Sequence, residues 1–259
     1  MILRPVALVT GASAGIGREI ARVLAADHDL ILSARRADEL ERLAVELRAK
    51  GAACRVVPGD LAEPDGAAKL HAAVGGAEVD VLVNNAGFGD LGPFADADLA
   101  KMLRMIRVNV TALTELTGLF LPAMVKRGRG RVLNVGSVAG FQPGPLMAVY
   151  YATKAFVNSF SQALSNELAG TGVTATCLCP GPTATEFAGV AGMQSTKTFT
   201  VGGVVGAGDV AVAGVRGMTR GKVLVVPGFR NRLLIFLERF APRGVVMRAV
   251  RWMQEKRRS

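Results

Sequence analysis

The sequence predicts an α/β fold in which one doubly wound parallel sheet of seven strands carries helices on both faces. Three observations support this prediction. Short apolar runs rich in β-branched residues alternate along the chain with longer segments of helical periodicity. Several of these runs have continuous apolar cores, as expected of parallel strands that are covered on both faces. The alternation accounts for almost all of the 259 residues and leaves no internal linker or repeat, so a single domain is expected.

The expected strands are short runs bounded by turn residues. The first, fourth and fifth of them read as continuous apolar cores. Parallel strands joined through helices require right-handed crossovers, which distribute the helices over the two faces of the sheet. The strands are predicted at residues 6–10, 29–34, 53–58, 79–84, 130–135, 173–178 and 222–226.

Segments of helical spacing separate these strands. The clearest is 37–50, which places Leu40, Leu43, Ala44 and Leu47 on one face and charged residues elsewhere. The helices are predicted at residues 17–26, 37–50, 64–74, 97–126 as an interrupted pair, 149–170 and 209–219.

Two regions depart from the alternation. Residues 185–208 are rich in Gly, Ala, Ser and Thr and have weak periodicity, which is typical of a mobile lid over a substrate. Residues 229–259 have apolar side chains at helical spacing and hold nine Lys and Arg against two Asp and Glu, a net +7 of the chain's +10. We therefore expect a body at 1–228 and a basic amphipathic helical extension at 229–259.

Composition excludes several classes of protein. Half of the residues are hydrophobic, which excludes a disordered chain. Three cysteines make no disulfide framework and indicate a cytoplasmic location, and Cys177 and Cys179, two apart in a predicted strand, are expected to pack in the core. His28 and His71 lie in unrelated places, so no histidine-based triad or metal site is expected. No apolar stretch reaches about 18 residues and the start lacks a signal-peptide pattern, so no spanning helix or leader is predicted.

A glycine-rich turn follows the first strand and opens a helix. It reads Thr10-Gly11-Ala12-Ser13-Ala14-Gly15-Ile16-Gly17, without the Gly-Lys-Ser/Thr of a phosphate-binding Walker loop. Glycines allow a sharp turn and close approach of a ligand, and the helix start offers free N–H groups and a positive dipole end to a pyrophosphate. The pattern predicts a dinucleotide site made by Gly11, Ser13, Ala14, Gly15, Ile16 and Gly17. A tight turn without a ligand is the alternative.

The end of the second strand bears on which dinucleotide binds. An NAD site usually has an acidic residue there, which binds the ribose 2′-hydroxyl. This chain has Ala34 followed by Arg35 and Arg36. A guanidinium binds a 2′-phosphate, whereas a carboxylate repels it, so Arg35 favours NADP(H) over NAD(H). The alternative is that both arginines form a solvated helix start.

At this point the sequence resembles the short-chain dehydrogenase/reductase family, over residues 6 to about 226. The resemblance rests on the order and spacing of several motifs: the glycine turn, Asp60-Leu61, Asn84-Asn85-Ala86-Gly87, Asn109, Ser137, Tyr150-x-x-x-Lys154 and Pro180-Gly181. It implies a Rossmann-type catalytic and dinucleotide-binding domain at 1–228 with strand order 3-2-1-4-5-6-7. The stretch after Ser33 and the basic tail look most like an NADP-preferring bacterial branch.

The resemblance also implies the catalytic residues. Tyr150 and Lys154 are four apart on a predicted helix and share a face. The ammonium, with the charge of the oxidised nicotinamide, would lower the phenol's pKa and let Tyr150 act as general acid or base. Ser137 would hold the reacting oxygen, and Asn109 would bind a water in a proton relay to Lys154. Ordinary structural roles remain as alternatives. Tyr150 and Lys154 would then be a pair on a helix surface, Ser137 a turn residue and Asn109 a helix cap. Tyr151 lacks the spacing and is expected to pack in the core.

Further cofactor contacts follow from the same resemblance. Asp60 would meet the adenine, although a turn acid is the alternative, with Leu61 beside it. Asn85, Ala86 and Gly87 would pass under the ribose, and Pro180, Gly181 and Thr183 would border the nicotinamide. The chain departs from many NADP-preferring relatives at Ala14, where they have Lys or Arg, which leaves Arg35 as the main discriminator.

The expected substrate is a hydrophobic ketone, aldehyde or secondary alcohol. The side chains predicted to edge its site are apolar and include no cluster of Lys or Arg to hold an anion. Some of them are expected to belong to the core instead. They are Phe88, Phe94, Phe141, Leu146, Met147, Phe187 and Met193.

Partners and rival functions complete the expectations. A net charge of +10 is compatible with binding to nucleic acid, anionic lipid or a phosphorylated ligand. The sequence contains no recognised nucleic-acid-binding module, so we expect no binding to nucleic acid. The basic tail would lie on an anionic membrane or, preferably, pack on the body or on a second subunit. Family members are usually dimers or tetramers. The rivals are a catalytically silent NADP(H)-binding regulator and a nucleotide-sugar epimerase of the longer, extended branch.

Overall fold

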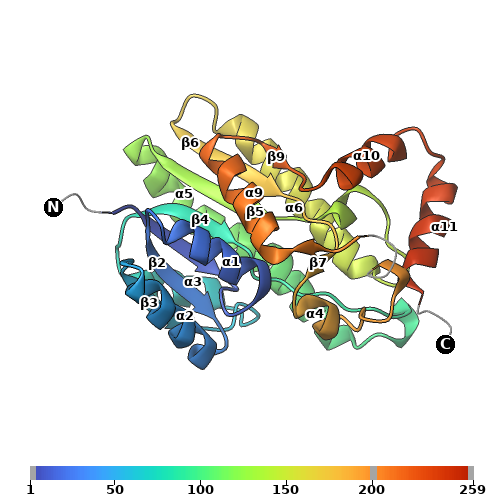
Figure 1. The fold of residues 1–259 in the computed structure, drawn as a ribbon, viewed down its shortest axis with the longest axis horizontal. Helices are drawn as coiled ribbons and strands as arrows, with labels where there is room; N and C mark the ends of the chain where they lie inside the picture. Colours follow the sequence, from blue (N-terminus) through green and yellow to red (C-terminus); the bar gives the residue numbers. More distant parts are fainter. Residues whose placement is uncertain (1–3, 199–202, 256–259) are drawn as a thin grey trace.

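The computed structural model describes residues 4–198 and 203–255. Its centre is one parallel sheet with the predicted strand order, β3-β2-β1-β4-β5-β6-β9, with helices on both faces (Figure 1). The predicted strands are confirmed, although the third begins later and the seventh is shorter than 222–226. Their bounds are β1 (Val6–Thr10), β2 (Asp29–Ala34), β3 (Cys54–Pro58), β4 (Val79–Asn84), β5 (Gly130–Val135), β6 (Val173–Leu178) and β9 (Leu224–Val225).

Alternation along the strands divides the core into two layers. In β1, Ala7 and Val9 pack with the helices of one face and Leu8 with those of the other. Helices α1 (Gly15–Leu24), α2 (Ala37–Ala49) and α9 (Ala207–Thr219) supply the first layer. Helices α3 (Gly66–Val74), α5 (Leu113–Arg127) and α6 (Ala148–Glu167) cover the opposite face. Burial on both faces explains why the strands read as apolar runs.

The interrupted helical pair predicted at 97–126 is one long run with an irregular middle. Helix α4 (Leu99–Ile106) leads through a π-helical segment, Arg107–Ala112, into α5. The run Leu99–Arg127 is long and apolar enough to cross a membrane by length and composition, which the sequence analysis did not predict. Its residues Leu116, Phe120 and Met124 are buried in the layer beside the sheet, which is the packing of a core helix.

The segment predicted as a lid, 185–208, is tied to the body near both of its ends. Strands β7 (Thr183–Ala184) and β8 (Val205–Gly206), which were not predicted, pair in parallel. Helix α7 (Phe187–Val190) follows β7, and residues 199–202 of the predicted lid lie outside the described residues. The mobility of this segment stays a prediction.

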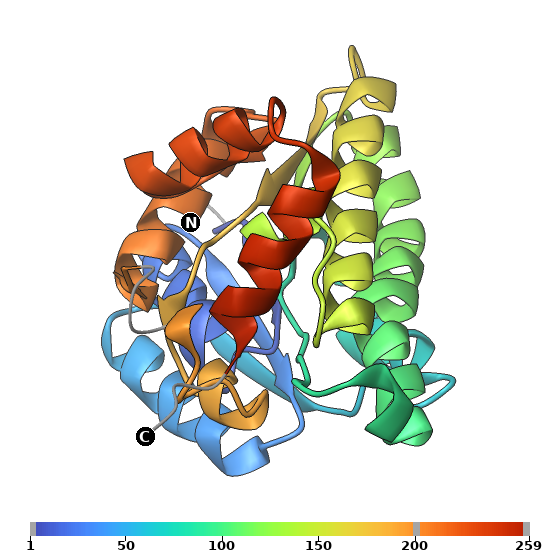
Figure 2. The same cartoon turned by 90° about the vertical axis from the view of Figure 1, so that its right-hand side faces the viewer.

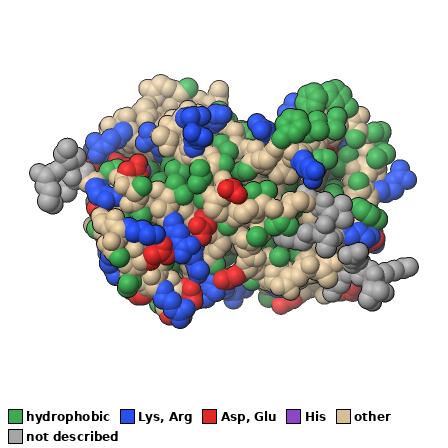
Figure 3. Space-filling model, in the orientation of Figure 1, with side chains coloured by type: hydrophobic (Ala, Val, Ile, Leu, Met, Phe, Trp, Pro, Cys, Tyr) green, Lys and Arg blue, Asp and Glu red, His purple; other side chains and the backbone are tan. Residues whose placement is uncertain are grey.

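The basic tail forms two helices that differ in their packing, α10 (Phe229–Glu238) and α11 (Arg243–Gln254). Helix α11 lies across the molecule (Figure 2), and its Val246, Val250 and Met253 pack on the body. Helix α10 has no buried residue in the described chain, and its apolar side chains form an exposed cluster edged by arginines (Figure 3). Helix α11 therefore packs on the body as expected, whereas α10 lies against it with half-buried residues only.

Candidate active site

A cavity of about 450 Å³ opens at the carboxyl ends of the parallel strands. Loops that leave β1, β2, β3, β4, β5 and β6 all contribute to its lining, which is where open α/β sheets bind ligands. The structure brings together Ser137 and all but one of the predicted cofactor residues, Gly17 being the exception. Those that line the cavity are Gly11, Ser13, Ala14, Gly15, Ile16, Arg35, Asp60, Leu61, Asn85, Ala86, Gly87, Tyr150, Lys154, Pro180, Gly181 and Thr183.

The glycine turn forms the floor of one end of the cavity. Gly11 has φ +65°, and a Cβ there would lie 2.7 Å from Asn85 Nδ2 and 2.9 Å from the Ala86 Cα. Gly17 lies behind the turn, where a Cβ would come 2.5 Å from the Gly11 carbonyl oxygen, so its role is close packing of α1 on β1. Helix α1 starts with no side-chain cap from Ala14, which leaves its N-terminal N–H groups for a ligand. This arrangement fits a dinucleotide pyrophosphate.

Asn85 and Thr10 hold the glycine turn in place. Asn85 Nδ2 donates to the carbonyl oxygens of Thr10, at 3.0 Å, and Gly11, at 3.2 Å. The Thr10 hydroxyl oxygen accepts from the backbone N–H groups of Asn85 and Ala86. The ends of β1 and β4 are therefore fixed to each other before any ligand binds. The predicted residues Asn85 and Ala86 have this structural function as well as their place in the cavity lining.

Two arginines line the part of the cavity beside the end of β2. Arg35 and Arg36 both line it and are exposed. Arg36 Nη2 lies 2.9 Å from Glu186 Oε2 and 3.4 Å from Ser13 Oγ, so it already joins the glycine turn to the segment after β7. Arg35 has neither a hydrogen bond nor an ion pair with any described residue, which leaves its guanidinium for an anionic ligand.

Asp60 lines the cavity and also stabilises its own loop. Its Oδ1 accepts from the Ala62 N–H at 2.9 Å, and its Oδ2 lies 3.0 Å from Arg104 Nη2. The turn-acid alternative therefore describes a real feature of the loop, and it is compatible with an adenine contact.

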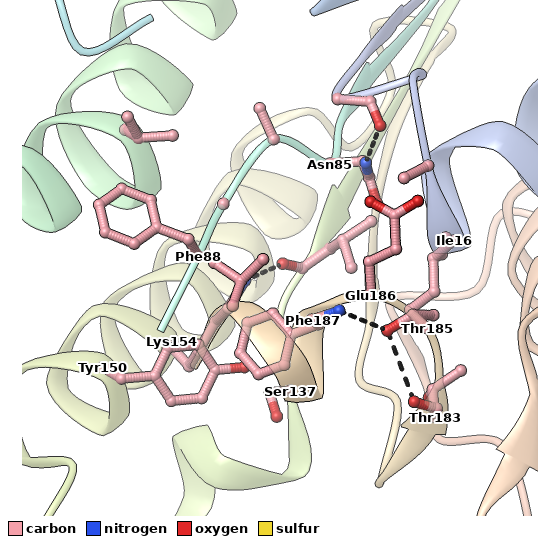
Figure 4. Close-up of a pocket in the computed structure, with 18 of the residues that line it drawn as sticks. Ile16, Asn85, Phe88, Ser137, Tyr150, Lys154, Thr183, Thr185, Glu186 and Phe187 are labelled. Atoms are coloured by element: carbon pink, nitrogen blue, oxygen red, sulfur yellow. Dashed lines mark hydrogen bonds between the residues drawn. The ribbon is translucent and has the colours of Figure 1, made fainter. Parts of the chain in front are cut away.

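Tyr150 and Lys154 lie on the face of α6 that borders the cavity (Figure 4). The Lys154 Nζ is 5.9 Å from the centre of the Tyr150 ring and donates to the Val135 carbonyl oxygen at 2.7 Å. The ring of Phe187, from α7, packs against Tyr150 with 5.3 Å between ring centres. The Tyr150 ring is thus held between α6, which bears it, and Phe187 of α7.

Burial sets the acidity of this pair. It raises the pKa of the Tyr150 phenol above its ordinary value, and hydrogen bonding with Ser137 only partly opposes this. It lowers the pKa of the Lys154 ammonium to about 8. The expected lowering of the phenol's pKa by Lys154 together with the oxidised nicotinamide stays a prediction for the cofactor-bound protein, because burial in the protein alone acts in the opposite direction. At neutral pH the Tyr150 phenol is protonated.

Ser137 follows β5 and is positioned by a residue that the sequence analysis missed. Asn158 Nδ2 donates to the Ser137 carbonyl oxygen at 2.9 Å, and its Oδ1 accepts from the Ser137 N–H at 3.4 Å and from the Cys179 thiol at 3.2 Å. Asn158 lies one helical turn after Lys154, so helical periodicity could have identified it. Cys177 and Cys179 are buried with their sulfur atoms 3.5 Å apart, which confirms their place in the core.

Asn109 lies behind the cavity and is not part of its lining. Its Oδ1 accepts from the Phe88 N–H at 3.1 Å, and its Nδ2 donates to the Phe88 carbonyl oxygen and to the Thr153 hydroxyl, each at 3.0 Å. Thr153 in turn donates to the Tyr150 carbonyl oxygen at 2.7 Å. Asn109 thus connects the loop after β4 to the catalytic helix, and its water relay stays a prediction.

The residues predicted to edge the substrate fall into two groups. Phe88, Met147, Phe187 and Met193 line the cavity. The other three lie elsewhere, because the sequence could not show which way each side chain points: Phe141 packs beside Leu113 and Val157 in the core, Phe94 is exposed in a single turn, and Leu146 has φ +67° in the loop before α6. Tyr151 is buried as expected but also lines the cavity.

Several known proteins are similar to this chain in sequence. The family model described as short chain dehydrogenase matches residues 5–195. The very-long-chain 3-oxoacyl-CoA reductase of Homo sapiens is 36% identical over 70% of this chain and 60% of its own length. The ketoacyl reductase HetN of Nostoc sp. is 37% identical over 67% of this chain and 62% of its own length. The chain therefore spans about 60% of the length of these curated relatives.

Solved structures match over nearly the whole chain. A short-chain dehydrogenase from Sphingobium yanoikuyae in complex with NADPH is 34% identical, with a TM-score of 0.83 over 93% of this chain and 95% of that one. The bulky-bulky ketone specific alcohol dehydrogenase from Comamonas testosteroni is 29% identical, with a TM-score of 0.78 over 95% of each chain.

Proposed function

The chain belongs to the short-chain dehydrogenase family, and on that premise we propose that it is an NADP(H)-dependent oxidoreductase. It interconverts a hydrophobic ketone or aldehyde and the corresponding alcohol. The observation that carries this proposal is a single cavity that is lined by the glycine turn at one end and by Ser137, Tyr150 and Lys154 at the other. A dinucleotide laid from one end to the other brings its reactive ring to the phenol.

The residues beside β2 support NADP(H) as the cofactor. Arg35 is free to bind a 2′-phosphate, and Arg36 lies beside it at the same edge of the cavity. Ala34 leaves no carboxylate at the end of β2 to repel that phosphate. The structure from Sphingobium yanoikuyae contains NADPH, which agrees with the preference that we propose. The same feature supports placement in an NADP-preferring bacterial branch.

The chain's own groups supply the proton for carbonyl reduction. When bound, the nicotinamide supplies the hydride. The Ser137 hydroxyl holds the carbonyl oxygen as negative charge develops on it. Tyr150, whose phenol is neutral because of its burial, gives its proton to that oxygen, since an alkoxide is a far stronger base than a phenolate. The buried ammonium of Lys154 stabilises the phenolate that remains, and in alcohol oxidation the same groups act in reverse.

The lining supports a bulky apolar substrate. Phe88, Met147, Phe187 and Met193 form the wall near Tyr150. The relatives include proteins named as 3-oxoacyl-CoA and ketoacyl reductases and one named as specific for bulky-bulky ketones. We propose that the segment 185–208 covers this substrate, because Phe187 packs directly against the Tyr150 ring.

The direct test follows NADPH absorbance with a panel of apolar and anionic carbonyl compounds. Apolar ketones and aldehydes should be reduced with the higher kcat/KM. Turnover of anionic compounds alone would overturn the substrate assignment. NADPH binding without turnover of any carbonyl compound would favour the silent regulator instead, a role against which the ordered Ser137, Tyr150 and Lys154 argue.

One observation favours a second function, in contact with an anionic lipid surface. Helix α10 exposes Phe229, Leu234, Phe236 and Leu237 beside arginines, and Phe240 just after it is exposed too, a pattern typical of interfacial helices. A self-complementary dimer through this face would oppose two equally basic surfaces. Co-sedimentation with anionic vesicles, compared with a variant in which Leu234, Phe236 and Phe240 become serine, tests it. Equal sedimentation of the two would refute this contact.

Two expectations concern the whole protein. We propose that it assembles as a homodimer or homotetramer, as is common in the family, and light scattering measures this directly. The cytoplasmic location stays a prediction.

A further inference from the structure

The last turn of α11 brings a polar side chain into the apolar end of the cavity. Gln254 lines the cavity although it lies 103 residues after Tyr151 of α6 in sequence. Only 2% of it is exposed. Its Nε2 donates to the Tyr151 hydroxyl at 2.7 Å, and Tyr151 lines the same cavity. The two side chains therefore form one polar pair, the Gln254–Tyr151 pair.

This pair leaves hydrogen-bonding capacity unused. Gln254 Oε1 is buried and has no hydrogen-bond partner within the part of the chain that the structure describes. The Tyr151 oxygen accepts from Gln254, so its own O–H hydrogen remains available to donate. Burial raises the pKa of Tyr151, which keeps that hydrogen in place at neutral pH. Buried polar groups are nearly always satisfied, so the unpaired amide oxygen of this lining residue would gain a partner if the side chain turned toward a ligand in the cavity.

The surroundings of the pair are apolar. Met147, Met193 and Val250 are buried with Tyr151 in one cluster, against which Phe187 packs. A leucine at 254 would remove the unpaired amide oxygen, although the Tyr151 hydroxyl would then lose the hydrogen bond from Gln254. The apolar packing of α11 alone therefore does not explain an amide at this position.

We propose that the Gln254–Tyr151 pair binds a hydroxyl group of the substrate, distinct from the oxygen that reacts. A hydroxyl can donate to Gln254 Oε1 and accept from the Tyr151 O–H at once, and it satisfies the amide in either orientation of its O and N atoms. With the amide oriented as in the structure, a carboxylate would place negative charge beside Gln254 Oε1, so a neutral hydroxyl suits the pair better. This inference rests on the proposed function and narrows its substrate class to apolar ketones or alcohols that bear a second hydroxyl.

The geometry separates the two recognition points. The Tyr150 and Tyr151 rings are 6.1 Å apart between centres and inclined at 77°, so neighbouring residues of α6 direct their hydroxyls to different places. Tyr150 serves the reacting oxygen together with Ser137. The Gln254–Tyr151 pair would bind the second oxygen of the substrate. The apolar wall between the two binding points would contact the hydrocarbon part of the substrate.

The test compares a decalone with the same decalone bearing a hydroxyl on the far ring. For the native protein with NADPH we expect kcat/KM to be about tenfold higher for the hydroxylated ketone, as expected for one hydrogen-bonded group. Gln254→Leu should abolish this preference, so that the hydroxylated ketone reacts with no higher kcat/KM than the plain decalone. Gln194→Leu is the matched control, because Gln194 is exposed and is not part of the cavity lining, and it should retain the preference.

A binding titration makes the outcomes distinct. Affinities of the same two ketones for the NADPH-loaded protein are measured without regard to turnover, and tighter binding of the hydroxylated ketone that depends on Gln254 supports the inference. Turnover without any preference, or a preference that survives in Gln254→Leu, overturns the inference and leaves the proposed function standing. Binding that depends on Gln254 without turnover refutes the proposed function alone. If neither ketone binds nor reacts, both are overturned.

Discussion

Lys154 is predicted to reduce the stability of the fold for the sake of function. Only 7% of its surface is exposed, and burial lowers its pKa from 10.5 to about 8. At 1.36 kcal/mol for each pH unit, keeping the ammonium protonated in the folded protein costs about 3 kcal/mol. Its hydrogen bond to the Val135 carbonyl oxygen, 2.7 Å long, stabilises the folded protein by about 1 kcal/mol. Lys154→Met should therefore raise the free energy of unfolding by about 2 kcal/mol at pH 7 and abolish turnover.

The stability difference between the native protein and Lys154→Met should depend on pH. The folded-state pKa lies below the unfolded one, so between about pH 8 and 10.5 the unfolded chain binds the extra proton and the native protein gains stability as pH rises. Below pH 8 the penalty is complete. The advantage of the methionine variant should thus be largest near pH 7 and fall by about 2 kcal/mol by pH 9.5.

Urea denaturation of both proteins at pH 7 and pH 9.5 measures the effect. The control is Lys69→Met, because Lys69 is exposed on α3 and its loss should change stability by less than about 0.5 kcal/mol. A Lys154→Met variant that is less stable than the native protein at pH 7, or a difference that does not change with pH, would refute the assignment of a costly buried ammonium.

Three further predictions concern the cofactor and the catalytic loop. Arg35→Ala should lower kcat/KM for NADPH at least tenfold and leave that for NADH nearly unchanged, since one charge-assisted phosphate contact is lost; a native enzyme that prefers NADH would contradict it. Asn158→Leu should lower kcat about tenfold or more with an unchanged NADPH Kd, because the loop of Ser137 loses two hydrogen bonds; native kcat in this variant would show that Asn158 has no positioning role. Gly11→Ala should destabilise the fold by about 2 kcal/mol and weaken NADPH binding, because its φ is +65° and its Cβ would meet Asn85; native stability and affinity would refute this.

The strands and their order could be predicted because local patterns determine them. The run 79–84 has an apolar core at Val81, Leu82 and Val83, and a parallel strand covered on both faces has that pattern. The short strands β7 and β8 could not be predicted, because each has two residues and exists only through its pairing with the other. The same limit applies to the seventh strand, whose ends depend on its neighbour β6.

Some residues of the candidate site could likewise be predicted from the sequence, and others could not. Motif order identified the lining from Gly11 to Thr183, because each residue follows a strand end at the same edge of the sheet. Side-chain direction and burial are tertiary properties, so the sequence analysis placed Phe141 in the site and did not foresee that burial raises the pKa of Tyr150. The contact between Gln254 and Tyr151 joins positions far apart in the chain, and no local pattern indicates it.

The central claim is that the Tyr150 phenol transfers the proton while NADPH is oxidised. Its most direct test is the rate of NADPH oxidation with an apolar ketone for the native protein and for Tyr150→Phe, together with NADPH binding to each. We predict a fall in kcat of at least about a hundredfold with little change in NADPH affinity, because the ring remains and only the hydroxyl is lost. Native turnover in Tyr150→Phe would contradict the account.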